Sequence, residues 1–564
     1  MPAVPAPVSA PLPVPFSGLS PAPVWAHFAS LCAIPRPSKH EAALRGHLAA
    51  WAAARGIAHR VDAAGNLTLT KPATAGREDR PGVVLQGHLD MVCQQNAGTG
   101  HDFHRDPIRP VRDDGWLVAE TTTLGADNGI GVALALAVLD ADDLAHGPLE
   151  VLLTVDEEAG MGGAQGLAPG ALAGRLMINL DTENWGEFYL GCAGGLDALL
   201  DHPVGQVPWP DGHLPLRIVL DGLRGGHSGV DIHLERGNAI KLLVRALRGL
   251  EEACAIAVAA ITGGTARNAI PREAEARVAV APGAASLLGE TVGRLEALFR
   301  QELAGADDGL NLRCLPAEAF PSVCAPDGQR RLLAEARVAV APGAASLLGE
   351  TVGRLEALFR QELAGADDGP NLRCMPAEAF PSVCAPDGQR RLLAALHAAP
   401  NGVKRWSTRV PGVVETSDNL GVLNFAGGRC QATFMVRSLV DSGSRALGRE
   451  IADLFSLIGA RVELTGDYPG WAPNPASKLL ALAQAVYGRE FGGTAAVKVI
   501  HAGLECGIIG AKHPGLDILS FGPDIRGAHA PGERVRVESV AQAWRLLTAL
   551  LAAVPPEVDW NREA

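Results

Sequence analysis

Short apolar runs alternate with longer helix-forming stretches along much of the chain. The runs at 82–87, 150–155 and 176–180 are rich in Val, Leu, Ile and Met, as are strands that are buried on both faces of a parallel sheet. Between the first two, residues 129–139 form a stretch of Ala, Val and Leu that predicts a helix. Strands that alternate with helices in this way predict a three-layer α/β domain.

An internal repeat interrupts this pattern, because residues 275–334 recur almost unchanged as residues 335–394. The two copies differ at only two positions, where Leu310 and Leu315 of the first copy become Pro370 and Met375 of the second. Repeat folds that share one core need three or more units. A single near-identical pair indicates instead a recent tandem duplication or an error in assembling the sequence.

Each copy of the repeat carries the pattern of a strand, a helix, a second strand and the start of a second helix. In the first copy these elements are expected at 276–281, 284–303, 311–315 and from Gln329 onward. Two identical units compete for the same place in a sheet. We therefore expect one copy to complete its domain and the other to form an added layer or a poorly packed excursion.

Composition narrows the class of protein. With 564 residues the chain is long enough for two domains, and its net charge of −13 argues against a nucleic-acid-binding protein. No apolar run reaches the ~20 residues of a membrane helix. The first 24 residues are rich in Pro and Ala without a basic start, so we interpret them as a disordered or loosely docked leader rather than a secretion signal.

Cysteine usage predicts the compartment. The ten cysteines are scattered, without a Cys-x-x-Cys pair, and their spacing suggests neither a disulfide framework nor a zinc ribbon. The ordinary interpretation of each is a small buried apolar residue. This pattern fits a reducing cytoplasm.

Candidate chemistry follows the predicted strands. His88 and Asp90 close the first one, and period-2 alternation turns both to the same side. The histidine could bind a metal while the carboxylate orients it, although such a pair is more often structural. Asp127 lies between glycines that allow close backbone approach, and its alternative role is to cap a helix.

Three further sites of this kind lie along the chain. Asp156, Glu157 and Glu158 follow the second strand directly, where neighbouring carboxylates repel unless cations or solvent compensate. A solvated turn is the alternative there. Asp181 follows the third strand, and His529 lies near the C-terminus in a segment with glycines on both sides.

Taken together, two histidines and three carboxylates suit a pair of zinc ions. Zinc binds imidazole nitrogen and carboxylate oxygen, and a catalytic site leaves a position for water. Two metals that share a bridging carboxylate can activate one water between them. Each residue alone is ambiguous, whereas their joint occurrence in this order is specific.

At this point the sequence resembles the co-catalytic zinc peptidases that include carboxypeptidase G2 and aminoacylase. Within them it is most similar to the aminoacyl-histidine dipeptidases, the cytosolic Xaa-His dipeptidases. The resemblance runs from about residue 22 to about 552, and only the proline-rich leader and the duplication depart from it. Beyond the sites above, its motifs lie at 34–38, 225–229, 267–273 and 500–507.

The resemblance implies a role for each site residue. His88 and Asp181 would hold one zinc, Glu158 and His529 the other, and Asp127 would bridge both. Asp90 would orient His88, and Glu157 would be the general base for a water that bridges the metals. The residues implied to bind substrate are His227, Asn268, Arg437 and Gly503, with His227 resembling a residue that reaches into the partner subunit's site. Other divalent metals such as Co²⁺ or Mn²⁺ could replace zinc.

The resemblance also implies an architecture. The fold class is α/β: a three-layer α/β/α catalytic domain with an inserted α+β lid. The boundaries would be a leader at 1–24, the catalytic domain at 25–194 and 471–564, and the lid at 195–470. The lid would carry the contacts of a homodimer.

Three functions compete on this reading. The first is hydrolysis of unblocked dipeptides, including those with C-terminal His, and the motif at 500–507 favours it. The second is an acylase or deacetylase on the same metal core. The third is a catalytically inactive scaffold, which the presence of every expected ligand and of Glu157 disfavours.

Overall fold

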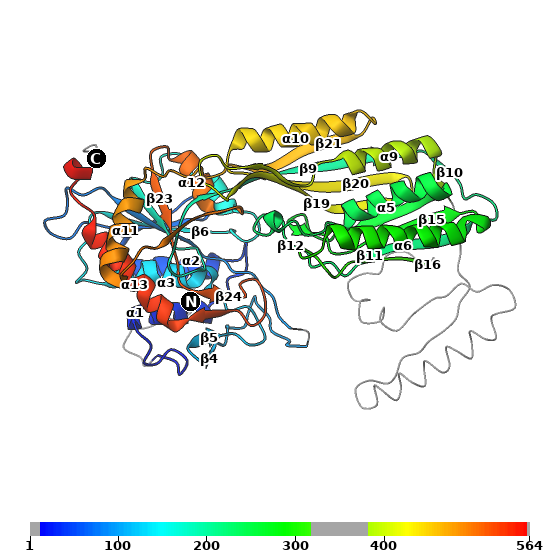
Figure 1. The fold of residues 1–564 in the computed structure, drawn as a ribbon. Coiled ribbons are helices and arrows are strands. Elements are labelled where there is room, and N and C mark those ends of the chain that lie inside the picture. The colour runs from blue at the N-terminus through cyan, green and yellow to red at the C-terminus, as the bar shows by residue number, and fades with distance from the viewer. Residues whose placement is uncertain (1–11, 97, 317–381, 561–564) are drawn as a thin grey trace, which may run out of the picture.

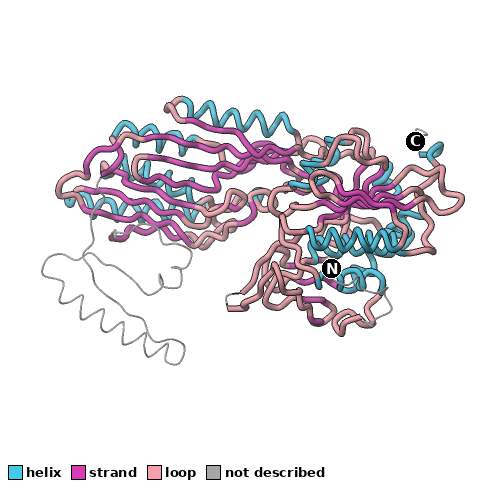
Figure 2. The backbone as a smooth tube through the Cα atoms, turned by 180° about the vertical axis from the view of Figure 1, so that it is seen from behind, coloured by secondary structure: helices cyan, strands magenta, loops and turns pink. Residues whose placement is uncertain are grey.

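The computed structural model describes residues 12–96, 98–316 and 382–560. Within them the chain forms two large sheets that lie side by side along an elongated molecule (Figures 1 and 2). The helix expected from Gln329 lies outside the described residues. In the described part of the chain, no helix is both long and apolar enough to cross a membrane.

The first sheet has eight strands, and its centre is parallel. In spatial order they are β1 (Ala58–Val61), β2 (Leu67–Lys71), β6 (Leu149–Thr154), β3 (Val83–His88), β7 (Leu176–Asn179), β23 (Asp517–Ser520), β8 (Glu187–Cys192) and β22 (Ala496–Ile500). Strand β3 pairs in parallel with both β6 and β7. The three apolar runs are therefore the adjacent central strands of one sheet, as the sequence predicted.

Helices cover both faces of this sheet. One core contains Val83 and Leu85 together with α1 (Ala22–Ala33), α2 (Ala42–Ala54), α3 (Ala126–Asp140), α11 (Lys478–Phe491) and α13 (Val537–Ala553). The intervening Val84 faces a second core with α4 (Gly162–Gly166) and α12 (Glu505–Lys512). Successive side chains of one strand thus enter opposite cores, which confirms the predicted three-layer α/β arrangement.

The second sheet has nine strands, and all of its pairings are antiparallel. Their order is β16 (Asn311–Pro316), β11 (Leu214–Asp221), β15 (Ala274–Val280), β13 (Ala257–Gly263), β19 (Val414–Ala426), β20 (Arg429–Ser438), β9 (Gly194–Pro203) and β21 (Arg461–Tyr468), with β18 (Gly402–Trp406) paired to β19. The helices that share its core are α5 (Ala239–Cys254), α6 (Ala285–Glu302), α9 (Pro386–Ala398) and α10 (Asp441–Ser456). This is the predicted α+β lid, inserted between the two parts of the first sheet.

The repeat supplies this lid from both of its copies. Strand β15, helix α6 and strand β16 come from the first copy, and Leu310 is fully buried in the lid core. Strand β17 (Ser382–Cys384) and α9 come from the second copy, with β17 paired to β10 (Gln206–Pro208). The expected helix of the second copy begins at Pro386, three residues before Gln389, because Pro is favoured in the first turn.

Part of the leader belongs to the first domain's core. The side chain of Phe16 is only 3% exposed, and its ring meets that of Phe28 edge to face at 6.2 Å. Helix α1 begins at Ala22. The described end of the leader is therefore docked, and the expected boundary after residue 24 falls inside a helix.

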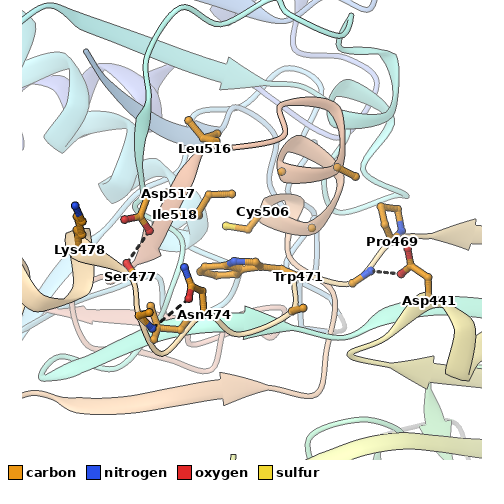
Figure 3. Close-up of a pocket in the computed structure, with 18 residues that line it drawn as sticks. Asp441, Pro469, Trp471, Asn474, Ser477, Lys478, Cys506, Leu516, Asp517 and Ile518 are labelled. Carbon is orange, nitrogen blue, oxygen red and sulfur yellow. Dashed lines mark hydrogen bonds between the residues drawn. The ribbon is translucent and has the colours of Figure 1, made fainter. Parts of the chain in front are cut away.

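Two antiparallel backbone hydrogen bonds join the chain where it leaves and re-enters the first domain. The N–H of Cys192 donates to the carbonyl of Trp471 at 3.0 Å, and the reverse bond measures 2.9 Å. The segment that re-enters the first domain, from Pro469 to Lys478, lines a cavity of about 590 Å³. Figure 3 shows side-chain hydrogen bonds that hold this segment, among them that from Ser477 to Asp517 at 2.6 Å and that from the N–H of Gly470 to Asp441 at 2.9 Å.

Candidate functional site

The predicted metal ligands meet at the carboxyl edge of the first sheet. His88 is the last residue of β3, Asp181 follows β7 by two residues, and Glu158 follows β6 by four. Parallel strands bring their carboxyl ends to one edge, which is where ligands bind in open α/β sheets. Asp127 opens helix α3, and His529 comes from the loop after β24 (Ile525–Arg526).

Each histidine lies between two carboxylates. His88 Nε2 is 3.2 Å from Asp127 Oδ1 and 3.2 Å from Asp181 Oδ1. His529 Nε2 is 3.2 Å from Asp127 Oδ2 and 3.1 Å from Glu158 Oε2. The two oxygens of Asp127 therefore face different histidines, which is the arrangement that a bridging ligand requires.

These five residues form two overlapping groups whose ligand atoms lie within 4.8 Å of one another. One group is His88, Asp127 and Asp181, and the other is Asp127, Glu158 and His529. A third group of the same size joins His88 to Glu157 and Glu158. The first two groups are the two ligand sets expected from the sequence, with Asp127 common to both.

The electrostatics of these residues fit divalent cations. Burial raises the pKa of Asp181 to about 7 against the attraction of His88, and burial raises the pKa of Glu157 well above its usual range. Hydrogen bonds to Asp127 and Glu158 raise the pKa of His529 to about 11. Asp181 Oδ1 and Glu158 Oε1 are buried without a hydrogen bond. Imidazole and carboxylate are the donors that zinc takes, so the residues present fit a metal pair.

Asp90 connects the first histidine to the loop that carries the glutamates. Its Oδ1 lies 3.4 Å from His88 Nδ1. Its two oxygens also accept the backbone N–H groups of Glu157, at 3.0 Å, and Glu158, at 3.1 Å, while Ser38 donates to it at 2.8 Å. Burial opposes its charge, but His88 and these donors outweigh burial and lower the pKa of Asp90 to about 2. It can therefore orient both His88 and the glutamate loop.

Sequence reasoning gave no role to two residues that support Asp127. The Glu533 carboxylate accepts four backbone N–H groups, those of residues 124–127, at 2.6 to 3.2 Å. The Arg36 guanidinium donates to the carbonyls of Leu89 and Asp90 at 2.9 Å, and it also reaches that of Gly125. The available signal was weak: Arg36 lies in the motif at 34–38 and Glu533 lies four residues after His529, but the partners of both lie far away in the chain.

A buried polar chain lies beneath the ligands. Asn179 Nδ2 donates to Gln86 Oε1 at 2.5 Å, and Gln86 Nε2 donates to Glu505 at 2.6 Å, as does Thr154 Oγ1. Burial raises the pKa of Glu505 to about 7. Gln86 and Asn179 precede His88 and Asp181 by two residues. The network therefore links the strands that present the two ligands.

Two of the predicted substrate residues approach this edge from the lid. Arg437, on β20, is 4% exposed and donates to Ser228 Oγ and to the Tyr468 hydroxyl, each at 3.3 Å. Its Nη2 lies 3.4 Å from His227 Nε2. Burial, followed by the charge of Arg437, lowers the pKa of His227 to about 4, so its imidazole is neutral near pH 7.

One cavity of about 860 Å³ contains the expected ligands together with lid residues. Its lining includes Glu157, His227 and Gly503. His227 thus lines the cavity formed within one chain, and its contribution to a partner subunit's site stays a prediction from the resemblance.

Asn268 is not among the described residues that line this cavity. It lies in the loop between β13 and β14 (Ala269–Ile270), and its side chain is exposed. Its carbonyl accepts the N–H of Ser228 at 2.8 Å. Asn268 therefore supports the backbone beside His227.

Comparison with known proteins agrees with this geometry. Residues 84–553 match Peptidase family M20/M25/M40. The chain is 41% identical over 539 residues to the cytosol non-specific dipeptidase of Escherichia coli (strain K12), covering 96% of this chain and 99% of that protein. The crystal structure of aminoacylhistidine dipeptidase from Vibrio alginolyticus is similar with a TM-score of 0.77 at 40% identity, over 96% of this chain and 98% of that one. Both similarities extend over nearly the full length of each chain.

Proposed function

The chain belongs to peptidase family M20/M25/M40, and on that premise we propose that it hydrolyses unblocked dipeptides, including Xaa-His dipeptides. The family predicted from the sequence motifs is confirmed. The observation that carries the proposal is the overlap of two ligand groups through Asp127, in a cavity that also holds Glu157 and His227.

We assign the two metal positions from these groups. His88 and Asp181 would hold one ion, Glu158 and His529 the other, and Asp127 both. Zinc is the proposed metal because imidazole and carboxylate are its usual ligands, and Co²⁺ or Mn²⁺ could replace it. When bound, the ions supply Lewis-acid catalysis and lower the pKa of water. Asp90 would fix the orientation of His88 through the 3.4 Å contact.

Glu157 would act as the general base. It lines the cavity beside the ligands, and its raised pKa suits a group that takes a proton from water and passes it to the leaving amine. Its backbone N–H is fixed by Asp90 at 3.0 Å. The same side chain would therefore serve as base and then as acid in one turnover.

The lid residues would bind the substrate carboxylate and stabilise the negative charge that develops on the carbonyl oxygen during the reaction. Arg437 is a guanidinium that can pair with the substrate carboxylate in a fork, and Gly503 would add a backbone contact from the opposite wall. His227, next to Arg437 at 3.4 Å, would donate to the oxyanion. We propose that Asn268 contributes by holding the backbone of Ser228 rather than by direct contact.

The proposed setting is cytoplasmic, since the Escherichia coli relative is a cytosolic dipeptidase and the cysteines are scattered. The proposed homodimer through the lid rests on the family resemblance. Light scattering on the purified protein tests it. The acylase alternative has no comparable support, because the relatives of high identity are dipeptidases.

A substrate panel with metal analysis tests the function. The purified protein would be assayed on Ala-His, on other dipeptides and on N-acetyl amino acids, with its metal content measured alongside. We expect hydrolysis of the free dipeptides, loss of activity after chelation, and recovery with Zn²⁺. Hydrolysis of N-acetyl amino acids in preference to dipeptides would overturn the proposal in favour of an acylase.

A further inference from the structure

The substrate cavity contains more carboxylates than the metal groups and the general base use. Besides Asp127, Glu157, Glu158 and Asp181, its lining includes Glu183 and Glu187. Glu187 already has partners, because the Tyr189 hydroxyl donates to it at 2.7 Å and Lys498 Nζ lies 3.6 Å away. Among the described residues, the Glu183 side chain has no hydrogen bond or ion pair and belongs to no metal group.

The backbone of Glu183 is held firmly next to the ligands. Its carbonyl accepts the N–H of Ile525 at 3.1 Å and the Arg526 guanidinium at 3.0 Å. It follows Asp181 by two residues and lines the same cavity as Asp127 and His529. The free carboxylate therefore belongs to the cavity that contains the proposed ligands.

Charge on the two sides of the cavity is complementary to a free dipeptide. On the lid side Arg437 is not itself in the lining but lies 3.4 Å from His227, which is, whereas the unpaired carboxylate of Glu183 is in the lining on the catalytic side. An unblocked dipeptide carries an ammonium at one end and a carboxylate at the other. Its ammonium is one carbon away from the carbonyl that reacts, so it must lie close to the metal ligands, on the side where Glu183 stands.

We propose that Glu183 binds the α-ammonium of the substrate and so determines the requirement for a free N-terminus. This inference rests on the proposed dipeptidase function and names the residue that separates a dipeptidase from an acylase on the same ligands. An acyl substrate has no ammonium and would leave the Glu183 charge unpaired in a partly buried site, which costs binding energy.

Paired substrates test the proposal. Ala-Leu and propionyl-leucine have the same shape apart from the amine. They would be assayed with wild type, Glu183→Gln and Glu187→Gln, and metal content and binding of a non-cleavable phosphinic Ala-Leu analogue would be measured for each. We expect Glu183→Gln to keep its metal and to lower kcat/KM for Ala-Leu by roughly 10- to 100-fold, mainly through KM, as loss of a charged hydrogen bond does.

The remaining measurements distinguish a failure of this inference from a failure of the proposed dipeptidase function. Propionyl-leucine should be little affected by Glu183→Gln, and Glu187→Gln should change neither substrate much because Glu187 is occupied by Tyr189 and Lys498. Equal losses on both substrates, or loss of metal from Glu183→Gln, would overturn the inference while leaving the dipeptidase function intact. If wild type hydrolysed propionyl-leucine as well as Ala-Leu, the proposed function itself would fail.

Discussion

In the catalytic sheet the central strands β6, β3 and β7 run parallel, whereas every pairing in the lid sheet is antiparallel. The parallel strands end at one edge, where several of the proposed ligands and the proposed base lie together. The lid contributes to the site through His227, on the short strand β12 (Gly226–His227), and through Arg437 near the end of β20. The parallel sheet places several functional residues along one edge, whereas the antiparallel lid brings single residues to that edge.

The two sheets also differ in what an insertion would disturb. In the described residues, β16 at the edge of the lid sheet is the last element before the second copy's β17 and α9. An insertion next to an edge strand displaces no neighbouring strand, and doubling the length of a loop costs only about 0.6 kcal/mol of closure entropy. An insertion between β3 and β7 would instead separate His88 from Asp181. The duplication therefore occurs in the region that can tolerate it.

The largest expected effect tests the catalytic edge. Replacing Glu157 by Gln should lower kcat by roughly 10²- to 10⁴-fold or more, because the proton transfer is lost. Metal content should stay near that of wild type, since the two expected ligand groups do not need Glu157. Steady-state kinetics with metal analysis check this, and wild-type turnover in the variant would remove Glu157 from its role.

A smaller effect is expected on the lid side of the cavity. Arg437→Ala should raise KM by roughly 10- to 100-fold for free dipeptides and far less for C-terminally amidated ones, because an amide offers no charge to the guanidinium. Arg429→Ala is the matched control, since Arg429 lies on the same strand but pairs with Asp201 at the surface. Equal effects of Arg437→Ala on acid and amide would contradict the assignment.

The contact between the catalytic domain and the lid should make the free energy of unfolding depend on pH. His501 of the catalytic side bonds Ser417 of the lid at 2.8 Å, and burial, with Arg437 nearby, lowers the pKa of His501 from 6.5 to about 3. Between these values the unfolded chain binds a proton that the native protein does not, so the free energy of unfolding falls as the pH falls. His501→Asn should flatten this dependence in thermal unfolding, and the exposed His59→Asn should not.

Mixing two inactive variants tests whether each lid serves its own chain. Glu157→Gln and His227→Ala would be co-expressed with different tags and purified as the mixed species, if one forms. Because His227 lines the cavity of its own chain, we expect no activity beyond that of the separate variants. Recovery of substantial activity would mean that a partner supplies the histidine, and the lid would then act across subunits.

The smallest effect is expected from removing the duplication. Deleting 317–376 or 335–394 gives the same sequence, because the copies are identical at 317–334 and 377–394, and removing 60 of the 564 residues leaves 504. The shortened chain keeps every described lid element, so its metal content and dipeptide turnover should equal or exceed those of the full chain, with improved solubility. Lost activity in the 504-residue protein would reveal a function of the extra copy.

Local pattern was sufficient for the strands and helices, whereas the roles of the proposed ligands came from the family resemblance. The run at 82–87 became β3 (Val83–His88), and the stretch at 129–139 lies within α3 (Ala126–Asp140). The structure brings His88, Asp127, Glu158, Asp181 and His529 within ligand distance of one another in two groups. The predictions of strands and helices succeeded because apolar periodicity fixes these elements, and parallel strands present their ends at one edge. The metal-binding roles of the five residues stay a prediction.

Contacts between residues that lie far apart in the sequence could not be predicted in the same way. Glu533 holds the backbone of Asp127 across 406 positions, and Glu505 contacts Gln86 across 419. Neither pairing leaves a trace in local spacing.

The sequence by itself thus determined the layers, the strands and the residue types of the proposed ligands, because these follow from side-chain periodicity and residue type. Only the tertiary structure decided that the Glu183 carboxylate stays unpaired in the cavity and which buried groups support Asp127. The reason is that unpaired charge and shared burial are properties of distances between segments, and those distances are set by the packing of the two sheets rather than by any one stretch of the chain.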